Sequence, residues 1–250
     1  MRITGAEVLW EALVQEGVET VFGYPGGAIM PVYDAMLNYP VHHVLTRHEQ
    51  GAAHMADGYA RSSGKVGVAL ATSGPGATNL VTGIATAQMD SSPIVCITGQ
   101  VHAHLLGGDA FQETDVTGIT LPITKHNFLI TSADEVHQVI REAFHIARSG
   151  RPGPVLIDFC KNAQLEVTDF KRERSPEKIS LPGYQPSKHA PEKELKKAVG
   201  LIADAERPVI LAGHGVLMSR GRKVLKEYAV KTSTPVAMTL LGLGALPASH

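Results

Sequence analysis

The carboxylate of Glu49 is the side chain in this sequence that is best placed to do chemistry. A hydrophobic run from Val41 to Leu45 precedes it and is typical of a strand, whereas the small residues that follow it are typical of a helix. In α/β proteins, ligands bind beside the carboxyl ends of parallel strands. Few other carboxylates lie close to it in the sequence, which disfavours a hydrolytic carboxylate pair. The position of Glu49 therefore predicts a contact with a bound cofactor.

Two glycine-rich segments could expose backbone N–H groups to the same ligand. The first runs from Gly23 to Ala28, and the second, from Ser73 to Asn79, follows an apolar run and precedes a predicted helix. Free N–H groups at the start of a helix can bind an anion or the polar edge of a heterocycle. The second segment lacks the third glycine and the acidic residue of a dinucleotide-binding turn. Taken alone, both segments are also consistent with tight turns that hold no ligand.

A metal site is the alternative that the histidines suggest. Six of them fall in the first 104 residues: His42, His43, His48, His54, His102 and His104. His42 and His43 point to opposite faces of the predicted strand, and no pair shows the i, i+4 spacing of a zinc protease helix. We therefore interpret the histidines as structural or surface residues and expect no metal ligand in this chain. Ser73 does not lie in the G-x-S-x-G motif of a serine hydrolase.

Two cations, Arg151 and Lys161, lie on either side of the last strand predicted in residues 1–163. Together they could hold a carboxylate or a phosphate group. The alternative is that both charges are solvated and bind nothing.

The composition restricts the class of protein. The 250 residues are 44% hydrophobic and 19% charged, and the formal net charge of −1 gives no basic surface for nucleic acid. No apolar run reaches the ~20 residues that span a membrane, and the N-terminus lacks the apolar core of a signal peptide. Cys96 and Cys160 both fall in strand-like runs, so we expect buried thiols in a reducing compartment, by default the cytoplasm.

Strand-like and helix-like segments alternate through residues 1–163, which predicts an α/β fold with a parallel sheet and helices on both faces. Thr4 and Glu7 have the spacing of a capping box for a first helix that ends at Gly17. The predicted strands are Thr20–Gly23, Val41–Leu45, Val66–Thr72, Ile94–Thr98 and Val155–Phe159, and the later helices are Ile29–Leu37, Gln50–Ser62, Ala77–Met89 and Ala133–Arg148. Residues 99–125 show no regular pattern.

The composition of the sequence changes after residue 163. Residues 164–190 are rich in charge and proline, which predicts a linker that cannot pack. Residues 191–250 show a second α/β pattern with two strands, two helices and a Gly213-His214-Gly215 turn. Two strands do not complete a sheet with two covered faces, so we expect this second domain to be truncated.

Six segments occur together in the order and spacing of one enzyme family. They are Phe22–Ala28, Arg47–Ala52, Thr72–Asn79, Gly99–Val101, Asp109–Glu113 and Gly150–Val155. From Met1 to about Pro247 the sequence resembles the large catalytic subunit of acetolactate synthase (acetohydroxyacid synthase), which uses thiamine diphosphate. The resemblance implies a pyrimidine-binding domain in residues 1–163 and the N-terminal part of a central FAD-binding domain in residues 191–250.

The resemblance also implies a role for Glu49. It matches the glutamate that hydrogen-bonds N1′ of the cofactor's aminopyrimidine ring, where it favours the imino tautomer that takes a proton from the thiazolium ring. Gln112 is implied as a second catalytic residue. Other implied contacts to thiamine diphosphate are Tyr24, Pro25, Gly26, Gly27, Pro75 and Asn79.

Substrate and flavin positions are carried over in the same way. Ala28, Phe111 and Lys161 match substrate positions, and Arg151, Gly213, Gly215, Thr239 and Leu240 match contacts to FAD, which the biosynthetic members bind without using its redox chemistry. The implied reaction joins pyruvate to pyruvate or 2-oxobutyrate with loss of carbon dioxide, the first common step of branched-chain amino acid biosynthesis. We expect a homodimer or tetramer, with a regulatory small subunit as a further partner.

The sequence departs from the family in three respects. His102, at the implied channel mouth, and Cys160 stand where proline is usual. The family's third domain, whose Asp and Asn bind Mg²⁺, has no counterpart here, so we expect a fragment that is inactive alone. Two alternatives stay open: another thiamine diphosphate 2-oxo acid decarboxylase or oxidase, and a non-catalytic flavin- or nucleotide-binding module.

Overall fold

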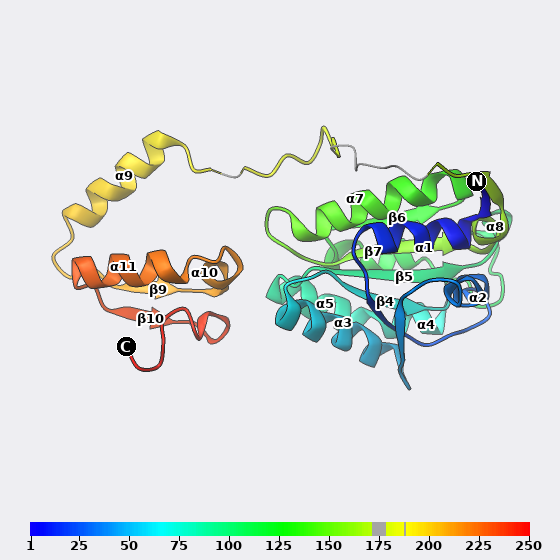
Figure 1. Cartoon of the computed structure of the whole chain (residues 1–250), viewed down its shortest axis with the longest axis horizontal. Coiled ribbons are helices and arrows are strands. Elements are labelled where there is room, and N and C mark those ends of the chain that lie inside the picture. The colour runs from blue at the N-terminus through cyan, green and yellow to red at the C-terminus, as the bar shows by residue number, and fades with distance from the viewer. Residues whose placement is uncertain (172–178, 188) are drawn as a thin grey trace. The chain divides into compact units, whose positions relative to one another are not determined.

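A parallel sheet of six strands, in the order β3-β2-β4-β5-β7-β6, organises the first part of the chain (Figure 1). Its strands are β2 (Thr20–Gly23), β3 (His42–Leu45), β4 (Gly67–Ala71), β5 (Ile94–Gln100), β6 (His126–Ile130) and β7 (Val155–Cys160). This computed structural model describes residues 1–171, 179–187 and 189–250. The chain forms two units, Met1–Pro186 and Ser187–His250, of which the first contains the sheet.

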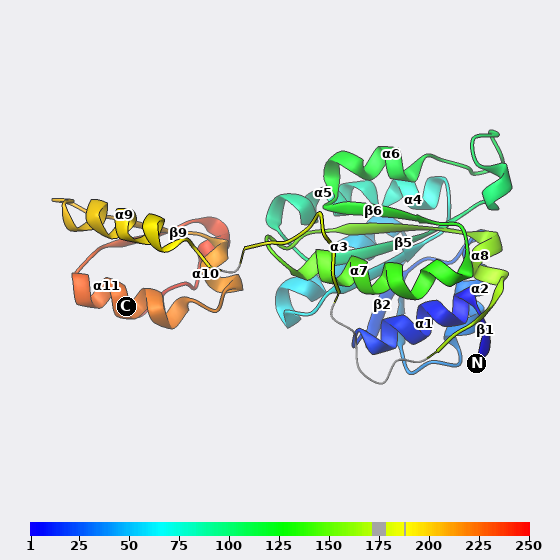
Figure 2. The ribbon, with the colours of Figure 1, turned by 90° about the horizontal axis from the view of Figure 1, so that it is seen from above.

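Helices cover both faces of the sheet, as predicted. One face carries α1 (Gly5–Gln15), α2 (Met30–Met36) and α7 (Val136–Arg148), and the other carries α3 (Glu49–Ser63), α4 (Pro75–Asn79), α5 (Val81–Asp90) and α6 (Val116–Thr120). Figure 1 shows α1 and α7 on one side and α3 and α5 on the other, and Figure 2 shows α6 on the side of α5. The predicted α/β fold is confirmed for this unit.

The central strands are apolar throughout because both of their faces are buried. Val68 and Leu70 of β4 join the core cluster under α1 and α7, whereas Ala69 and Ala71 join the cluster under α3 and α5. This alternation is the period of two that a strand imposes on its side chains. The second cluster is rich in alanine, so α3 can lie close to the sheet.

The start of α1 has the predicted capping box. The Thr4 hydroxyl accepts a hydrogen bond from the Glu7 N–H (3.3 Å), and Glu7 Oε2 accepts one from the Thr4 N–H (2.7 Å). Two orphan donors at the helix start are thereby satisfied.

The structure differs from the predicted elements in three places. The segment expected as one helix over residues 77–89 forms two, α4 and α5, which meet at Leu80. The irregular segment 99–125 contains α6 and two 3₁₀ turns, Ala103–Leu105 and Leu121–Ile123. Strand β6 was not predicted, because it lies at the sheet edge and begins with two polar residues, His126 and Asn127, which interrupt its apolar pattern.

The predicted linker over residues 164–190 needs correction at its start. Residues 161–165 form helix α8 (Lys161–Leu165), and β8 (Val167–Asp169) pairs antiparallel with β1 (Arg2–Thr4). Phe170 then lies in the core of the unit, 6% exposed. Backbone pairing and one apolar side chain thus extend the unit beyond residue 163. Part of the predicted linker, residues 172–178 and 188, lies outside the described residues.

A second contact fixes the chain near the end of this unit. Lys125 Nζ donates hydrogen bonds to the Ser149 carbonyl (2.8 Å), the Ile146 carbonyl and the Tyr184 hydroxyl (2.8 Å), and it lies over the Tyr184 ring. The Tyr184 hydroxyl in turn donates to the Ser149 carbonyl (2.8 Å). Tyr184 is therefore attached to the carboxyl end of α7.

The second unit has the two strands and two helices predicted for it, together with a helix, α10 (His214–Met218), that begins inside the predicted Gly213-His214-Gly215 turn. It contains α9 (Glu192–Ala203), β9 (Ile210–Ala212), α10, α11 (Arg222–Thr232), β10 (Val236–Met238) and a 3₁₀ turn, Leu240–Gly242. Strands β9 and β10 pair in parallel.

Two properties of the chain as a whole bear on the sequence predictions. Cys96 and Cys160 are both free and buried, as predicted. Among the described residues, the structure contains no helix that is long and apolar enough to cross a membrane.

We expect Phe170→Ala to lower the free energy of unfolding of the first unit by about 3–5 kcal/mol, the usual cost of truncating a buried phenylalanine. Unfolding can be followed by the fluorescence of Trp10, which is the only tryptophan and is fully buried in this unit. The control is Val167→Ala, at a side chain that is 49% exposed. Equal stability of the two variants would show that residues 167–170 do not belong to the folded unit.

Candidate functional site

The loops that follow β2, β3, β4, β5 and β7 all leave the same edge of the sheet, which we call the carboxyl edge, because these strands are parallel. Every predicted site residue of the first unit except Arg151 lies in these loops or in the first turns of the helices after them. The predicted site is therefore assembled at one edge, where α/β sheets place their ligands.

Glu49 is the first residue of α3. His48 caps this helix, and its Nδ1 accepts a hydrogen bond from the Gln50 N–H (3.1 Å). The Glu49 side chain turns inward, so that the residue is only 8% exposed. Asn79, at the end of α4, donates from Nδ2 to Glu49 Oε2 (2.9 Å). The carboxylate is thus buried and held on one side.

Thr72, which follows β4, fixes the two glycine turns around this carboxylate. A Cβ atom on Gly26 would lie 2.5 Å from the Thr72 Cβ, and one on Gly76 would lie 2.7 Å from the Thr72 Cγ2. The Thr72 hydroxyl also accepts a hydrogen bond from the Ala28 N–H (3.2 Å). Side chains are excluded at both glycines, so the two turns pack directly on Thr72.

The second oxygen of Glu49 remains available. Within the described part of the chain, Oε1 takes part in no hydrogen bond, and it lies 3.3 Å from the position that a Cβ on Gly76 would occupy. Gly76 therefore brings its backbone close to this free acceptor oxygen, at a point where Thr72 leaves no room for a side chain. This geometry suits a flat, hydrogen-bonding heterocycle.

Tyr33, on α2, is a further polar group behind this site. Its hydroxyl is buried and has no hydrogen-bond partner among the described residues, and a Cβ on Gly23 would lie 2.4 Å from it. Burial raises the pKa of the Tyr33 phenol, and the negative charge of Glu49 raises it further. The phenol therefore stays neutral beside the carboxylate.

Helix α8 holds the Gly23–Ala28 turn from outside. Lys161 Nζ donates to the Gly27 carbonyl (3.0 Å), and Gln164 Nε2 donates to the Ala28 carbonyl (2.8 Å) and to the Phe159 carbonyl (2.8 Å). Lys161 and Ala28, two predicted substrate positions, are thus brought close together. Tyr24 and Pro25 lie at the exposed side of the same turn, and Tyr24 is 44% exposed.

The loop after β5 brings Phe111 and Gln112 to the carboxyl edge. The side chain of Phe111 is 88% exposed, whereas the backbone of Gln112 presses on the second glycine turn. A Cβ on Gly74 would lie 2.7 Å from the Gln112 carbonyl oxygen. The predicted catalytic residue Gln112 therefore lies beside the turn that contains Pro75 and Asn79.

A buried polar network supports this loop from within the sheet. Asp158 is 1% exposed and accepts hydrogen bonds from the Thr98 hydroxyl (2.7 Å) and from Gln100 Nε2 (2.8 Å). Gln100 Nε2 also donates to the Thr114 carbonyl (2.9 Å). Burial raises the pKa of Asp158 to about 7; the two hydrogen bonds oppose this rise, and the charge of Asp115 adds to it.

Arg151 does not join these residues. It precedes β7 and so lies at the opposite, amino edge of the sheet. Its guanidinium donates to the Ser91 hydroxyl (2.7 Å) and to the Met89 carbonyl (3.2 Å) at the end of α5. These contacts hold the last turn of α5. If Arg151 also contacted a flavin, its side chain would have to serve both roles.

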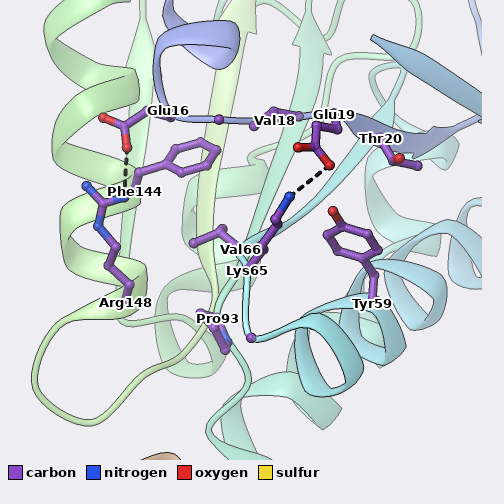
Figure 3. Close-up of a pocket in the computed structure, with 12 residues that line it drawn as sticks. Glu16, Val18, Glu19, Thr20, Tyr59, Lys65, Val66, Pro93, Phe144 and Arg148 are labelled. Carbon is purple, nitrogen blue, oxygen red and sulfur yellow. Dashed lines mark hydrogen bonds and ion pairs between the residues drawn. The ribbon is translucent and has the colours of Figure 1, made fainter.

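A recess of about 360 Å³ also lies at the amino edge (Figure 3). Apolar side chains and two ion pairs line it: Val18, Val66, Phe144, Lys65 with Glu19 (2.8 Å) and Arg148 with Glu16 (2.9 Å). Each of these cations already faces a carboxylate, as Figure 3 shows. The recess therefore offers a ligand little charge, and we do not assign it as the site.

In the second unit, the predicted flavin contacts lie close to one another. The Thr239 N–H donates to the Ala212 carbonyl (3.0 Å), and the space beside Gly213 is open up to the Thr239 hydroxyl at 3.8 Å. Gly215 has no atom within 4 Å of a Cβ position, and Leu240 is 82% exposed. The open glycines leave room for the backbone to approach a ligand closely.

The histidines do not form a metal site. Among the described residues, no group of three His, Cys, Asp or Glu side chains could hold a metal ion. His102 and His104 do lie near each other, with ring centroids 5.6 Å apart.

Four residues that shape the site were not predicted from the sequence. They are Tyr33, Thr72, Asp158 and Gln164. Asp158 had a visible signal, because a lone carboxylate in an apolar, doubly buried strand must be hydrogen-bonded. Thr72 had a weaker one, a hydroxyl at the end of a predicted strand. Tyr33 and Gln164 act through contacts between distant parts of the chain, which no local pattern indicates.

Comparisons with known proteins show the family to which this chain is similar. Residues 3–119 match the family described as thiamine pyrophosphate enzyme, N-terminal TPP binding domain, and residues 195–250 match the thiamine pyrophosphate enzyme central domain. A probable acetolactate synthase large subunit of Methanocaldococcus jannaschii is 53% identical over 98% of this chain and 42% of its own length. Acetolactate synthase large subunits of Corynebacterium glutamicum and Buchnera aphidicola are 50% and 47% identical, over 100% and 99% of this chain and 40% and 43% of theirs. The chain thus spans about two-fifths of these relatives, 40–43% of their lengths.

The two neighbouring glycines of the first turn provide a matched test of the packing on Thr72. Gly26→Ala should lower the free energy of unfolding by about 1–3 kcal/mol, the usual cost of overpacking. Gly27→Ala should change it by less than about 0.5 kcal/mol, because no atom lies within 4 Å of its Cβ position. Urea unfolding followed by Trp10 fluorescence measures both values. An equal loss of stability in Gly26→Ala and Gly27→Ala would contradict the close approach of Gly26 to Thr72.

Asp158 should make the stability of the first unit depend on pH. Its pKa is raised from 3.8 to about 7 in the folded state, so the unfolded state loses its proton first as the pH rises. The contribution of Asp158 to stability is therefore largest below 3.8 and falls as the pH approaches about 7, above which it is constant.

Asp158→Asn should remove this dependence. Urea unfolding at about pH 5 and about pH 8 measures the change in stability between them, and the loss on going to the higher pH should be smaller in the variant. The comparison of slopes is independent of any constant cost of the substitution. An equal change in the free energy of unfolding between the two pH values in the variant and the wild type would mean that the buried carboxyl titrates normally.

Proposed function

Since the chain belongs to the thiamine pyrophosphate enzymes, we propose that it is the pyrimidine-binding part, with part of the central domain, of an acetolactate synthase large subunit. The reaction is the condensation of pyruvate with pyruvate or 2-oxobutyrate, with loss of carbon dioxide, in branched-chain amino acid biosynthesis. Relatives that carry this name match almost the whole chain at about half identity, 47–53%. The names of these relatives support this activity over that of other enzymes of the family.

One observation carries the proposal. Glu49 belongs to the buried residues, its Oε2 is bonded to Asn79, and its Oε1 lies beside the Gly76 backbone with no hydrogen bond among the described residues. An aminopyrimidine ring needs a carboxylate acceptor at one ring nitrogen and a flat space next to it. The free acceptor oxygen and the close backbone of the two glycine turns fit this ring, so Glu49, Gly26 and Gly76 would hold it.

The residues of this chain act by holding a proton and by placing the reactants. When bound, thiamine diphosphate supplies the carbon nucleophile and accepts the electrons released with carbon dioxide. Glu49 Oε1 holds the proton at the pyrimidine ring nitrogen, and burial strengthens that hydrogen bond because water is excluded. Asn79 keeps the other oxygen occupied, so the carboxylate presents one oxygen in one orientation.

Neighbouring residues have supporting roles. Gln112 would contact the cofactor from the loop that packs on Gly74, and Phe111 and Ala28 would line the substrate space. Lys161, which is anchored on the Gly27 carbonyl, would attract the carboxylate of the 2-oxo acid. Tyr24, Pro25, Gly27 and Pro75 complete the turns around the cofactor.

The remaining cofactors and partners follow from the same proposal. FAD would bind beside the open Gly213 and Gly215 turn, with Thr239 and Leu240 as further contacts. Mg²⁺ and the cofactor's diphosphate would be held by a domain outside these residues. The enzyme would act as a homodimer or tetramer with a regulatory small subunit. A reducing compartment such as the cytoplasm suits its two free, buried thiols.

We expect Glu49→Gln to lower kcat for acetolactate formation by about 10²–10⁴-fold, the usual contribution of a positioned acid–base group. The measurement uses an enzyme in which this sequence replaces the aligned 250 residues of the Corynebacterium glutamicum relative. Glu19→Gln is the matched control, because it makes the same change on an exposed side chain at the amino edge.

The outcomes separate the proposed function from its alternatives. Acetolactate production by the wild-type chimera, lost in Glu49→Gln and kept in Glu19→Gln, supports the proposal. Decarboxylation of pyruvate without condensation would indicate another thiamine diphosphate enzyme. Turnover in Glu49→Gln at the wild-type rate would overturn the role of Glu49.

A further inference from the structure

The loop from Gly107 to Glu113 is folded around the carboxylate of its own last residue. Glu113 Oε1 accepts a hydrogen bond from the Gly107 N–H, and Oε2 accepts one from the Ala110 N–H (3.1 Å). The Glu113 N–H donates back to the Ala110 carbonyl (2.9 Å). The N–H groups of Gly107 and Ala110 lower the pKa of this carboxyl, and those of Gly108 and Asp109 contribute to the same effect.

We call these two hydrogen bonds of the Glu113 carboxylate the Glu113 clasp. They hold a backbone that would otherwise adopt a more favourable conformation. Asp109 and Gln112 both adopt the left-handed conformation, with φ of 53° and 59°, which is unfavourable for residues other than glycine. Such conformations persist only where surrounding contacts determine them. Within this loop, the carboxylate of Glu113 provides those contacts on both sides of Asp109.

The clasp determines where Gln112 lies. On one side, the Gln112 backbone packs against Gly74, where a Cβ would come within 2.7 Å of its carbonyl oxygen. On the other, the next anchor is Thr114, whose carbonyl accepts the hydrogen bond from Gln100. Gln112 thus sits between a loop closed by Glu113 and a residue fixed to the buried network of Asp158.

We propose that Glu113 is a positioning residue: its carboxylate closes the 107–113 loop and so sets Gln112 against the Gly74 turn of the cofactor site. The catalytic consequence rests on the proposed function, whereas the structural consequence does not. Loss of the carboxylate should free the loop without unfolding the sheet, because no atom of the core contributes to the clasp.

Hydrogen exchange in the 250-residue chain tests the structural part. In Glu113→Ala and Glu113→Gln, amides of residues 107–112 should exchange at least about tenfold faster, since their protecting acceptor is lost or halved. The exchange rates of the amides of β4 and β5 should be unchanged. Asp109→Asn is the control, because it removes a charge from the same loop and tolerates the left-handed conformation. Unchanged loop exchange in both Glu113 variants would overturn the proposal.

A double-mutant cycle in the chimera tests the link to Gln112. If Glu113 acts through Gln112, Glu113→Ala should lower kcat about tenfold alone and have little further effect in Gln112→Asn, because the two changes remove one interaction. Additive losses would refute a positioning role for Glu113, even with a faster-exchanging loop. An inactive wild-type chimera would count against the proposed function alone, because the exchange measurement needs neither cofactor nor turnover.

Discussion

The packing of two glycine turns on Thr72 is the constraint on which the rest of the site depends. Because β2 and β4 are neighbours in the sheet, the turn after β2 and the start of α4 meet over one threonine. Neither Gly26 nor Gly76 could carry a side chain there. This closeness brings Asn79 within reach of Glu49, which fixes one carboxylate oxygen and leaves the other without a hydrogen bond among the described residues. A small loss of packing density at Thr72 would therefore directly change how the Glu49 side chain is held.

Residues from later parts of the chain hold each of these turns in place. Lys161 and Gln164, which follow β7, bind the carbonyls of the first turn, and the loop that contains Gln112 covers the second. The site therefore forms only when residues 1–165 are folded together, since no single motif encloses the carboxylate. Helix α8 contributes to this arrangement although it has only five residues, Lys161–Leu165.

Much of the fold could be predicted because burial on both faces makes the central strands continuously apolar, and because Thr4 and Glu7 form a local cap. Strand β6 could not, since its first two residues, His126 and Asn127, are polar and resemble those of a loop, and neither could the docking of Phe170, which depends on pairing with the N-terminal strand. The position of Glu49 at a strand end was visible in the sequence. Its bond to Asn79 was not, because it joins side chains 30 residues apart and depends on how the helices pack.

The attachment of Tyr184 to the end of α7 has a mechanical consequence. A pulling force on the second unit would reach the first through the segment next to Tyr184, before it reached β8. The load would fall on the hydrogen bonds of Lys125 and on the Ser149 carbonyl, which lie at the end of a helix. The pairing of β8 with β1 would be spared until these bonds had broken. The contacts of Tyr184 would thus bear a pulling force before the β1–β8 pairing of the unit that contains the site.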